Sequence, residues 1–254
     1  MALLKATKLS KVFGGLRAVS NFDIEIAPGE LVGLIGPNGA GKTTAFNLLT
    51  GVYEPTEGQI EFDGKSVVGL KPYQITQKGI ARTFQNIRLF ADLTVLDNVK
   101  IAYHFHVKYG LLASFFRIGG YHAEEAEIEE KAIRFLEIFQ LADKKDEIAK
   151  NLPYGEQRRL EIARALAAQP KLLLLDEPAA GMNPQETQQL MEMIRWIKNE
   201  FKLTILLIEH DMSLVMGVCE RIYVLDYGSI IAQGTPHEIK NNPRVIEAYL
   251  GEEV

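Results

Sequence analysis

The sequence predicts an α/β protein with a mostly parallel central sheet, and two observations carry this prediction. A glycine-rich loop at residues 36–44 lies between a short apolar run at 31–35 and a segment of helical pattern at 44–50. Uninterrupted apolar runs of strand length at 172–175 and 204–208 alternate with helix-like segments in the C-terminal part. Strands buried on both faces lack polar alternation, and their alternation with helices is typical of a parallel sheet with helices on both faces.

The glycine-rich loop is the strongest single signal. It fits G-x-x-x-x-G-K-[ST] at every fixed position and reads Gly36, Pro37, Asn38, Gly39, Ala40, Gly41, Lys42, Thr43, Thr44. Its glycines let backbone N–H groups approach a phosphate chain, and the start of the next helix adds a positive dipole end. Lys42 is expected to reach the β- and γ-phosphates of a nucleoside triphosphate, and the Thr43 hydroxyl to bind Mg²⁺. The alternative is a flexible glycine turn with an accidental lysine, and the flanking strand and helix argue against it.

Composition and charge favour a globular protein and disfavour nucleic-acid-binding and membrane-spanning classes. The 254 residues are 47% hydrophobic and 24% charged, which suits one large domain or a core with one insertion. A net charge of -5 gives no basic footprint for nucleic acid. The single cysteine excludes an internal disulfide, and no apolar run approaches the roughly 18 residues that span a bilayer. We expect a cytosolic protein unless a partner holds it at a membrane.

Two further parts flank the predicted core. Short, partly alternating segments predict an antiparallel β subdomain at about 1–30 and 52–70, packed as a second sheet. Residues at about 93–169 have helical patterns and are interpreted as an insertion. Within it, Thr94 is a plausible N-cap, and the helix at 124–141 has one apolar face with acids opposite.

Polar residues follow three of the predicted strands. Asp176 and Glu177 end the run at 172–175, at the sheet edge where ligands bind in such folds. Asp176 is expected to bind the hydration shell of Mg²⁺, and Glu177 to orient or deprotonate the attacking water. The alternative is a strand that ends in solvated acids. Gln85 and His210 are candidates for contact with Mg²⁺ or water and with the γ-phosphate, although glutamines in loops are mostly solvated and a lone histidine is more often structural.

The order of these residues along the chain is stronger evidence for a protein family than any one of them alone. Over its whole length the sequence resembles the ATP-binding-cassette (ABC) ATPases. The matching positions are Phe13, the loop at 36–44, Gln85, a signature-like segment at 152–157, Asp176 with Glu177, and His210. The resemblance implies a P-loop NTPase with a RecA-like parallel-sheet core, an N-terminal antiparallel β subdomain and an inserted helical subdomain. It also implies that Phe13 stacks on adenine, that Gln85 belongs to the Q-loop, and that His210 is the switch histidine.

The resemblance implies a mechanism that needs two cassettes. They pair head to tail and enclose ATP between the phosphate loop of one and the signature of the other. Here Tyr154, Gly155 and Glu156 begin a predicted helix whose N–H groups could bind the γ-phosphate across the interface. Implied partners are membrane permease subunits, a second ABC ATPase subunit (the same chain or another) and, indirectly, an extracytoplasmic solute-binding protein. The implied location is the cytoplasmic face of the membrane, as a peripheral protein.

The sequence departs from the family pattern at three places. The usual Ser-Gly-Gly-Gln is Pro-Tyr-Gly-Glu at 153–156, and Pro153 offers neither hydroxyl nor N–H to the γ-phosphate. A lost hydrogen bond of this kind costs about 1–3 kcal/mol where the partner stays unsatisfied. Ala-Gly-Met-Asn at 180–183 replaces the usual Ser-Ala-Leu-Asp of the D-loop. Phe13 lacks a hydroxyl, but stacking needs only its ring.

Within the family, the sequence is most similar to the ATPases of branched-chain amino-acid importers. The segments that carry this similarity are 82–90, 154–164, 177–184, 209–216 and 241–251. The stretch at 103–121 resembles the insertion of the LivG-type subunit rather than its shorter LivF-type partner. Nothing in the nucleotide chemistry specifies an amino acid, so the solute class rests on resemblance alone.

Other functions fit the sequence less well than an importer subunit. A soluble cassette that acts on nucleic acid or ribosomes is disfavoured by the single cassette, the lack of sustained heptads and the acidic balance. A switch GTPase would need an Asn-Lys-x-Asp run, which is missing, and a P-loop kinase would not need the signature and histidine. An importer for another solute remains an alternative. The apolar stretch at 109–118 is expected either near the permease or packed as a surface helix on its own subdomain.

Overall fold

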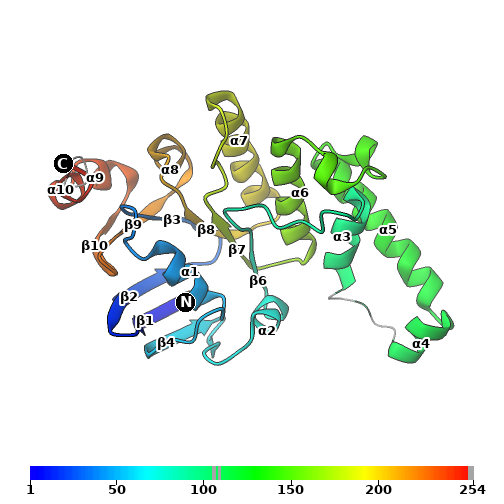
Figure 1. The fold of residues 1–254 in the computed structure, drawn as a ribbon, viewed down its shortest axis with the longest axis horizontal. Helices are drawn as coiled ribbons and strands as arrows, with labels where there is room; N and C mark the ends of the chain where they lie inside the picture. Colours follow the sequence, from blue (N-terminus) through cyan, green and yellow to red (C-terminus); the bar gives the residue numbers. More distant parts are fainter. Residues whose placement is uncertain (105–106, 108–109, 251–254) are drawn as a thin grey trace. The chain divides into compact units, whose positions relative to one another are not determined.

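The computed structural model describes residues 1–104, 107 and 110–250, without the side chains of 111–113 and 250. It divides into two compact units (Figure 1). The sheet unit consists of Met1–Gln85 and Lys171–Val254, and the helical unit of Asn86–Pro170. Each unit is described by itself. Among the described helices, none is both long and apolar enough to cross a bilayer.

The sheet unit begins with an antiparallel sheet of order β2-β1-β4-β5. Buried residues alternate with exposed ones in part of each of its three longer strands, as expected for a sheet with one wet face. The sequence pattern predicts a first strand at residues 3–9, whereas β1 continues to Phe13, which pairs with Leu16 of β2. The strands are β1 (Leu4–Phe13), β2 (Leu16–Ile26), β4 (Glu57–Phe62) and β5 (Lys65–Ser66).

The second sheet has the order β10-β9-β3-β8-β7-β6. All its pairs are parallel except β10 with β9, which pair antiparallel as a hairpin. Every residue of β3, β7 and β8 is buried, which confirms the prediction from their uninterrupted apolar runs. Its strands are β3 (Leu31–Ile35), β6 (Ile80–Arg82), β7 (Leu172–Asp176), β8 (Thr204–Ile208), β9 (Arg221–Asp226) and β10 (Ser229–Gly234).

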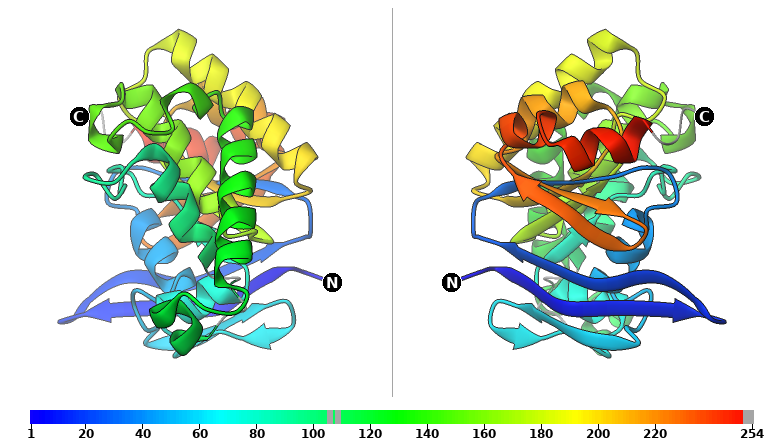
Figure 2. Two further views of the ribbon diagram at one scale, coloured as in Figure 1. Left: turned by 90° about the vertical axis from the view of Figure 1, so that its right-hand side faces the viewer. Right: turned by 90° about the vertical axis from the view of Figure 1, so that its left-hand side faces the viewer.

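Helix α1 (Lys42–Leu49) joins the two sheets into one core (Figure 2). One hydrophobic cluster contains Phe46 of α1, Phe22 of the antiparallel sheet and Leu34 of the parallel sheet. The helix begins two residues earlier than the pattern predicted, because Gly41 adopts a left-handed conformation and accepts the Ala45 amide. The other helices of this unit are α2 (Pro72–Gln77), α7 (Pro184–Glu200), α8 (Met212–Val218), α9 (Pro236–Lys240) and α10 (Pro243–Leu250).

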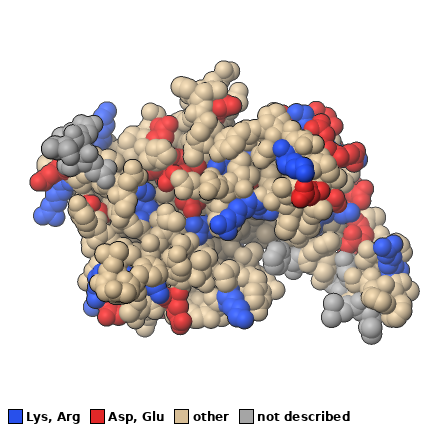
Figure 3. Space-filling view, in the orientation of Figure 1, with Lys and Arg blue, Asp and Glu red and all other residues tan. Residues whose placement is uncertain are grey.

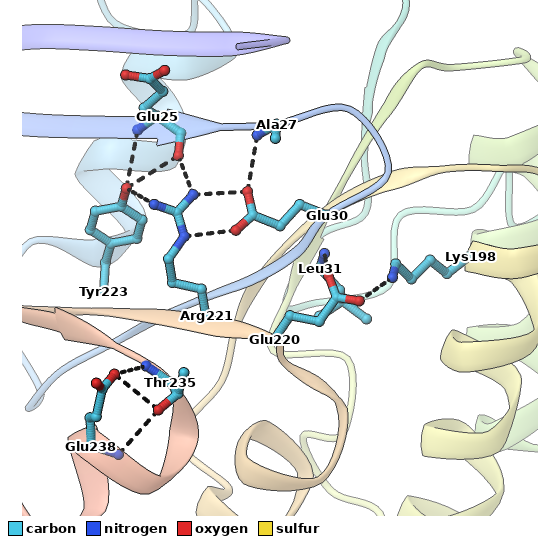
Figure 4. Close-up of polar contacts among 10 residues, drawn as sticks. All are labelled: Glu25, Ala27, Glu30, Leu31, Lys198, Glu220, Arg221, Tyr223, Thr235 and Glu238. Carbon is cyan, nitrogen blue, oxygen red and sulfur yellow. Dashed lines mark hydrogen bonds and ion pairs between the residues drawn. The ribbon is translucent and has the colours of Figure 1, made fainter. Parts of the chain in front are cut away.

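A polar cluster also ties the sheets together at the start of β9 (Figure 4). The Arg221 guanidinium binds the Glu30 carboxylate at 2.7 and 2.8 Å and donates to the Glu25 carbonyl at 2.6 Å. The Tyr223 hydroxyl donates to the same carbonyl at 3.2 Å. The cluster thus connects β2, the start of β3 and β9.

In the helical unit, the helix predicted at 124–141 is observed as α5, which begins and ends three residues earlier. The Thr94 side chain accepts the Asp97 amide and caps α3, as predicted. Ile128 and Leu136 are buried on one face of α5, and acidic side chains gather on the visible face of this unit (Figure 3). Tyr109 of the expected apolar stretch lies outside the described residues. The elements are α3 (Val95–Tyr103), α4 (Leu111–Phe116), α5 (Tyr121–Ile138), α6 (Tyr154–Ala167) and the 3₁₀ turns η2 (Ala142–Lys144) and η3 (Ala149–Asn151).

Candidate nucleotide site

The glycine-rich loop leads from the end of β3 to the start of α1 and lies against neighbouring backbone. A Cβ added to Gly36 would lie 2.0 Å from the Leu225 carbonyl oxygen, and one added to Gly41 would lie 2.5 Å from that of Ala18. The Gly228 amide donates to the Ala40 carbonyl at 2.8 Å. Glycine is therefore required at positions 36 and 41 by close approach of β9 and β2.

Lys42 lies inside this loop rather than in solvent. Its ammonium donates to the carbonyl oxygens of Gly36 and Pro37 at 2.6 and 2.8 Å, and the residue is buried. Thr43 follows at the first turn of α1 and is exposed, whereas Asn38 and Gly39 form the exposed part of the loop. The ammonium therefore lies against the carbonyls of the loop, and Lys42 is the first residue of α1, whose N-terminus carries the positive end of the helix dipole.

Three predicted site residues meet beyond the carboxyl ends of β6, β7 and β8. The Gln85 amide donates to Glu177 Oε2 at 2.7 Å, and His210 Nδ1 lies 3.6 Å from the same oxygen. Glu177 has a left-handed backbone, with φ of +44°, which is uncommon for a residue with a side chain. Parallel strands place these loops at one edge, so residues far apart in the chain converge on one carboxylate.

Asp176 is buried at the end of β7, and its carboxylate Oδ2 lies 2.6 Å from Arg82 Nη2. Its own amide donates to the Thr83 hydroxyl at 3.4 Å. No motif in the sequence assigns a role to Arg82 or Thr83. A charged residue at the end of an apolar strand segment is the signal that could have found Arg82, because a charge with a buried side chain needs a partner.

Glu209 is a second residue that the sequence argument missed. Its buried carboxylate accepts amides of Ala179 at 2.7 Å, His210 at 3.1 Å and Asp211 at 3.4 Å. Burial raises the pKa of Glu209, although these three hydrogen bonds and the neighbouring imidazole of His210 oppose the shift. Glu209 thereby links the loop after β7, which carries Glu177, to the loop after β8, which carries His210.

The expected adenine-stacking residue, Phe13, lies at the end of β1 and is 39% exposed. The Tyr53 ring meets it edge to face at 5.2 Å between centroids, and Lys11 Nζ lies 5.1 Å from its centroid. An exposed ring in such surroundings is available for stacking. Tyr53 was not singled out from the sequence, and no motif in its neighbourhood marks it.

The signature-like residues lie in the helical unit, at the start of α6. Pro153 occupies the N-cap position without a side-chain hydrogen bond, and Tyr154 and Gly155 begin the helix. The Glu156 carboxylate binds Lys144 Nζ through both oxygens at 2.7 Å, which raises the pKa of Lys144. The Glu156 amide donates to the Pro153 carbonyl at 3.0 Å. Glu156 is therefore engaged within its own unit through both its carboxylate and its amide.

The oxygen donors at the sheet edge suit Mg²⁺. Thr43 offers a hydroxyl, Gln85 an amide and Asp176 one carboxylate. Among the residues that the structure describes, no group of three or more His, Cys, Asp or Glu forms a cage for a metal ion. Mg²⁺ is typically held by one or two carboxylates together with waters and substrate phosphates, so this sparse donor set fits it.

Comparisons with known proteins agree with this geometry. Residues 19–180 match the ABC transporter family, and residues 229–254 match the branched-chain amino acid ATP-binding cassette transporter family. The chain is 50% identical over 98% of its length, and 98% of the relative's, to the high-affinity branched-chain amino acid transport ATP-binding protein LivG of Escherichia coli.

Two solved structures extend the comparison. A crystal structure of the ADP conformation of an ATP-binding cassette from an ABC transporter matches with a TM-score of 0.85 and 31% identity over 99% of both chains. A dimeric post-hydrolysis cassette bound to ADP and phosphate matches with a TM-score of 0.77 and 25% identity over 92% of this chain and 98% of that one. The predicted cassette fold is confirmed. This chain is a nucleotide-binding ATPase of the ABC transporter family, in its branch of branched-chain amino-acid transport ATP-binding proteins.

Proposed function

We propose that this chain hydrolyses ATP to power a membrane importer of branched-chain amino acids, as one of two paired cassettes. The observation that carries the hydrolytic part is the convergence of Gln85, Glu177 and His210, with Gln85 bound to Glu177 at 2.7 Å. The solute class is supported by the 50% identical relative and not by any contact in the nucleotide site.

Nucleotide binding is assigned to the loop of Gly36 to Thr44 with the exposed Phe13 ring. ATP would place its phosphates on the loop amides and Lys42, and its adenine on Phe13. Mg²⁺, when bound, supplies positive charge that neutralises the phosphate oxygens during phosphoryl transfer. Thr43, Gln85 and Asp176 are the residues that would hold it.

Glu177 is assigned to the attacking water. Its carboxylate is 16% exposed, so water can reach it, and the Gln85 amide restricts its orientation. A carboxylate in hydrogen-bond reach of the water can orient it and accept its proton. His210 lies beside the same carboxylate and is assigned to the γ-phosphate as a hydrogen-bond donor.

A second cassette would complete the site. The start of α6, with Tyr154 and Gly155, would donate backbone N–H groups to the γ-phosphate bound by the partner. Because the Glu156 amide and carboxylate are engaged within the helical unit, the contribution of Glu156 would be smaller than in the signature pattern of the family. The solved cassette dimer bound to ADP and phosphate supports pairing of this kind.

The assembly would include permease subunits, a second ATPase subunit (identical or different) and, indirectly, an extracytoplasmic solute-binding protein, with the chain at the cytoplasmic face of the membrane. In the helical unit, Phe115, Phe116 and Ile118 are 81%, 61% and 59% exposed, which makes this segment a candidate permease contact. Pull-down from detergent-solubilised membranes is expected to recover permease chains, and recovery of none would contradict the importer.

The mechanism is tested by Glu177→Gln. The variant keeps the size of the side chain but cannot accept the proton, so ATP turnover is expected to fall by about 10²–10⁴-fold. ATP binding should be retained, and the ATP-bound dimer should persist longer in gel filtration. Glu192→Gln on α7, which removes an exposed carboxylate, is the matched control. Wild-type turnover in Glu177→Gln would remove Glu177 from this role.

A further inference from the structure

Arg82 has a buried side chain at the end of β6, and its contacts with described residues lie in the sheet unit. Its side chain is 8% exposed, and that of its partner Asp176 is 5% exposed. A buried ion pair adds little net stability over apolar residues of similar volume, because both charges lose their hydration. Among the residues that the structure describes, moreover, none provides a hydrogen-bond partner for the buried guanidinium Nε. Stability alone therefore gives no reason for an arginine here.

The guanidinium connects two elements that carry proposed magnesium donors. Nη2 binds Asp176 Oδ2 at 2.6 Å, at the end of β7. Nη1 donates to Asn47 Oδ1 at 2.7 Å and to Thr50 Oγ1 at 3.2 Å, both near the C-terminal end of α1. Thr43 lies one helical turn before Asn47 on α1. One planar group thus sets the separation between the strand of Asp176 and the helix of Thr43.

Two aromatic rings restrict the guanidinium further. Its central carbon lies 5.5 Å from the Phe46 ring centroid and 5.0 Å from that of Phe84. Cation–π contacts of this length favour a fixed position for an arginine fork, whose bidentate geometry a lysine cannot reproduce. The Asp176 carboxylate is therefore held by a group that has little freedom of its own.

We propose that Arg82 is a positioning residue for Mg²⁺ binding, which fixes the Asp176 carboxylate relative to Thr43 through Asn47. This inference rests on the proposed assignment of Asp176 and Thr43 to the metal. Partners that orient a metal ligand from the outer shell change metal affinity by about 10-fold or more when removed. The positive guanidinium also repels the metal cation. Loss of its positioning role would therefore lower metal affinity, whereas loss of its charge would raise metal affinity.

The test measures binding of Mn²⁺ to the ADP-loaded full chain by the electron paramagnetic resonance signal of the free ion. Titration of a fluorescent ADP without metal provides a second readout. Arg82→Met and Asn47→Leu are expected to weaken Mn²⁺ binding by about 10-fold while metal-free ADP affinity stays within about twofold. Arg82→Lys should retain part of the affinity. Asn47→Leu changes no charge, so its effect on Mn²⁺ binding measures only the loss of positioning. If Arg82→Met does not fold, Asn47→Leu therefore still tests the proposal.

Two further variants complete the design. Arg221→Met removes another arginine–carboxylate ion pair, with Glu30 at 2.7 Å, which is more exposed and lies outside the metal site, and should leave Mn²⁺ binding unchanged (Figure 4). Asp176→Asn should weaken Mn²⁺ binding if the metal assignment holds. Suppose that Asp176→Asn weakens Mn²⁺ binding. If Arg82→Met then binds Mn²⁺ as tightly as the wild type or more tightly, or if Asn47→Leu has no effect on Mn²⁺ binding, the positioning role of Arg82 is overturned and the metal assignment stands. No effect of Asp176→Asn would overturn the metal assignment and this inference with it.

Discussion

Gly36→Ala isolates the contribution of the close approach between the phosphate loop and β9. The new Cβ would lie 2.0 Å from the Leu225 carbonyl oxygen, well short of the 3.4 Å at which ordinary contact begins. The obstacle is backbone rather than the end of a flexible side chain, so the loop or the strand must move by more than about 1 Å.

The expected cost combines overlap and backbone strain. Overpacking of a tightly packed site costs about 1–3 kcal/mol, and an unfavourable backbone conformation for an L-residue adds about 1–2 kcal/mol. We therefore expect Gly36→Ala to lower the free energy of unfolding by about 2–5 kcal/mol. Nucleotide affinity should fall by at least about 10-fold, because displaced amides lose charge-assisted hydrogen bonds to phosphate.

Gly29→Ala is the matched control for strain. Its φ is +77°, but a Cβ there would meet no atom within 4 Å. Only the strain of about 1–2 kcal/mol is then expected, without an effect on nucleotide. Urea unfolding followed by circular dichroism and titration of a fluorescent ATP analogue measure the two quantities. If Gly36→Ala behaved like Gly29→Ala in both assays, the close approach to β9 would not be what requires glycine.

Two other outcomes are expected. Lys42→Ala removes the ammonium that binds the Gly36 and Pro37 carbonyls and the phosphates, so affinity for the fluorescent ATP analogue should fall at least about 10-fold; unchanged affinity would contradict its assignment. Burial raises the pKa of the Tyr103 phenol above its ordinary value of 10.0, so the folded state holds that proton more tightly and stability falls as pH rises above 10. Tyr103→Phe should remove this part of the pH dependence in urea unfolding between pH 9 and 11, and an unaltered slope would argue against it.

Much of the fold was predictable because its signals are local. The apolar runs of β7 and β8 identify strands buried on both faces, and the Thr94 cap marks the start of α3. The phosphate loop is likewise recognisable, because its function depends on glycines and a lysine at fixed spacing. Ends of elements were less well predicted: β1 continues to Phe13 because cross-strand pairing, and not periodicity, determines where it stops.

The sequence by itself determined the cassette fold, the phosphate loop and the identity of Gln85, Glu177 and His210 as candidates. Only the tertiary structure brought these three together, because the strand order places the ends of β6, β7 and β8 at neighbouring positions of one sheet. It alone also showed that Arg82 contacts Asn47, 35 residues away, and Asp176, 94 residues away. Periodicity and motifs report the few residues around a position, whereas a contact over that distance depends on how the strands are ordered and what packs between the sheets.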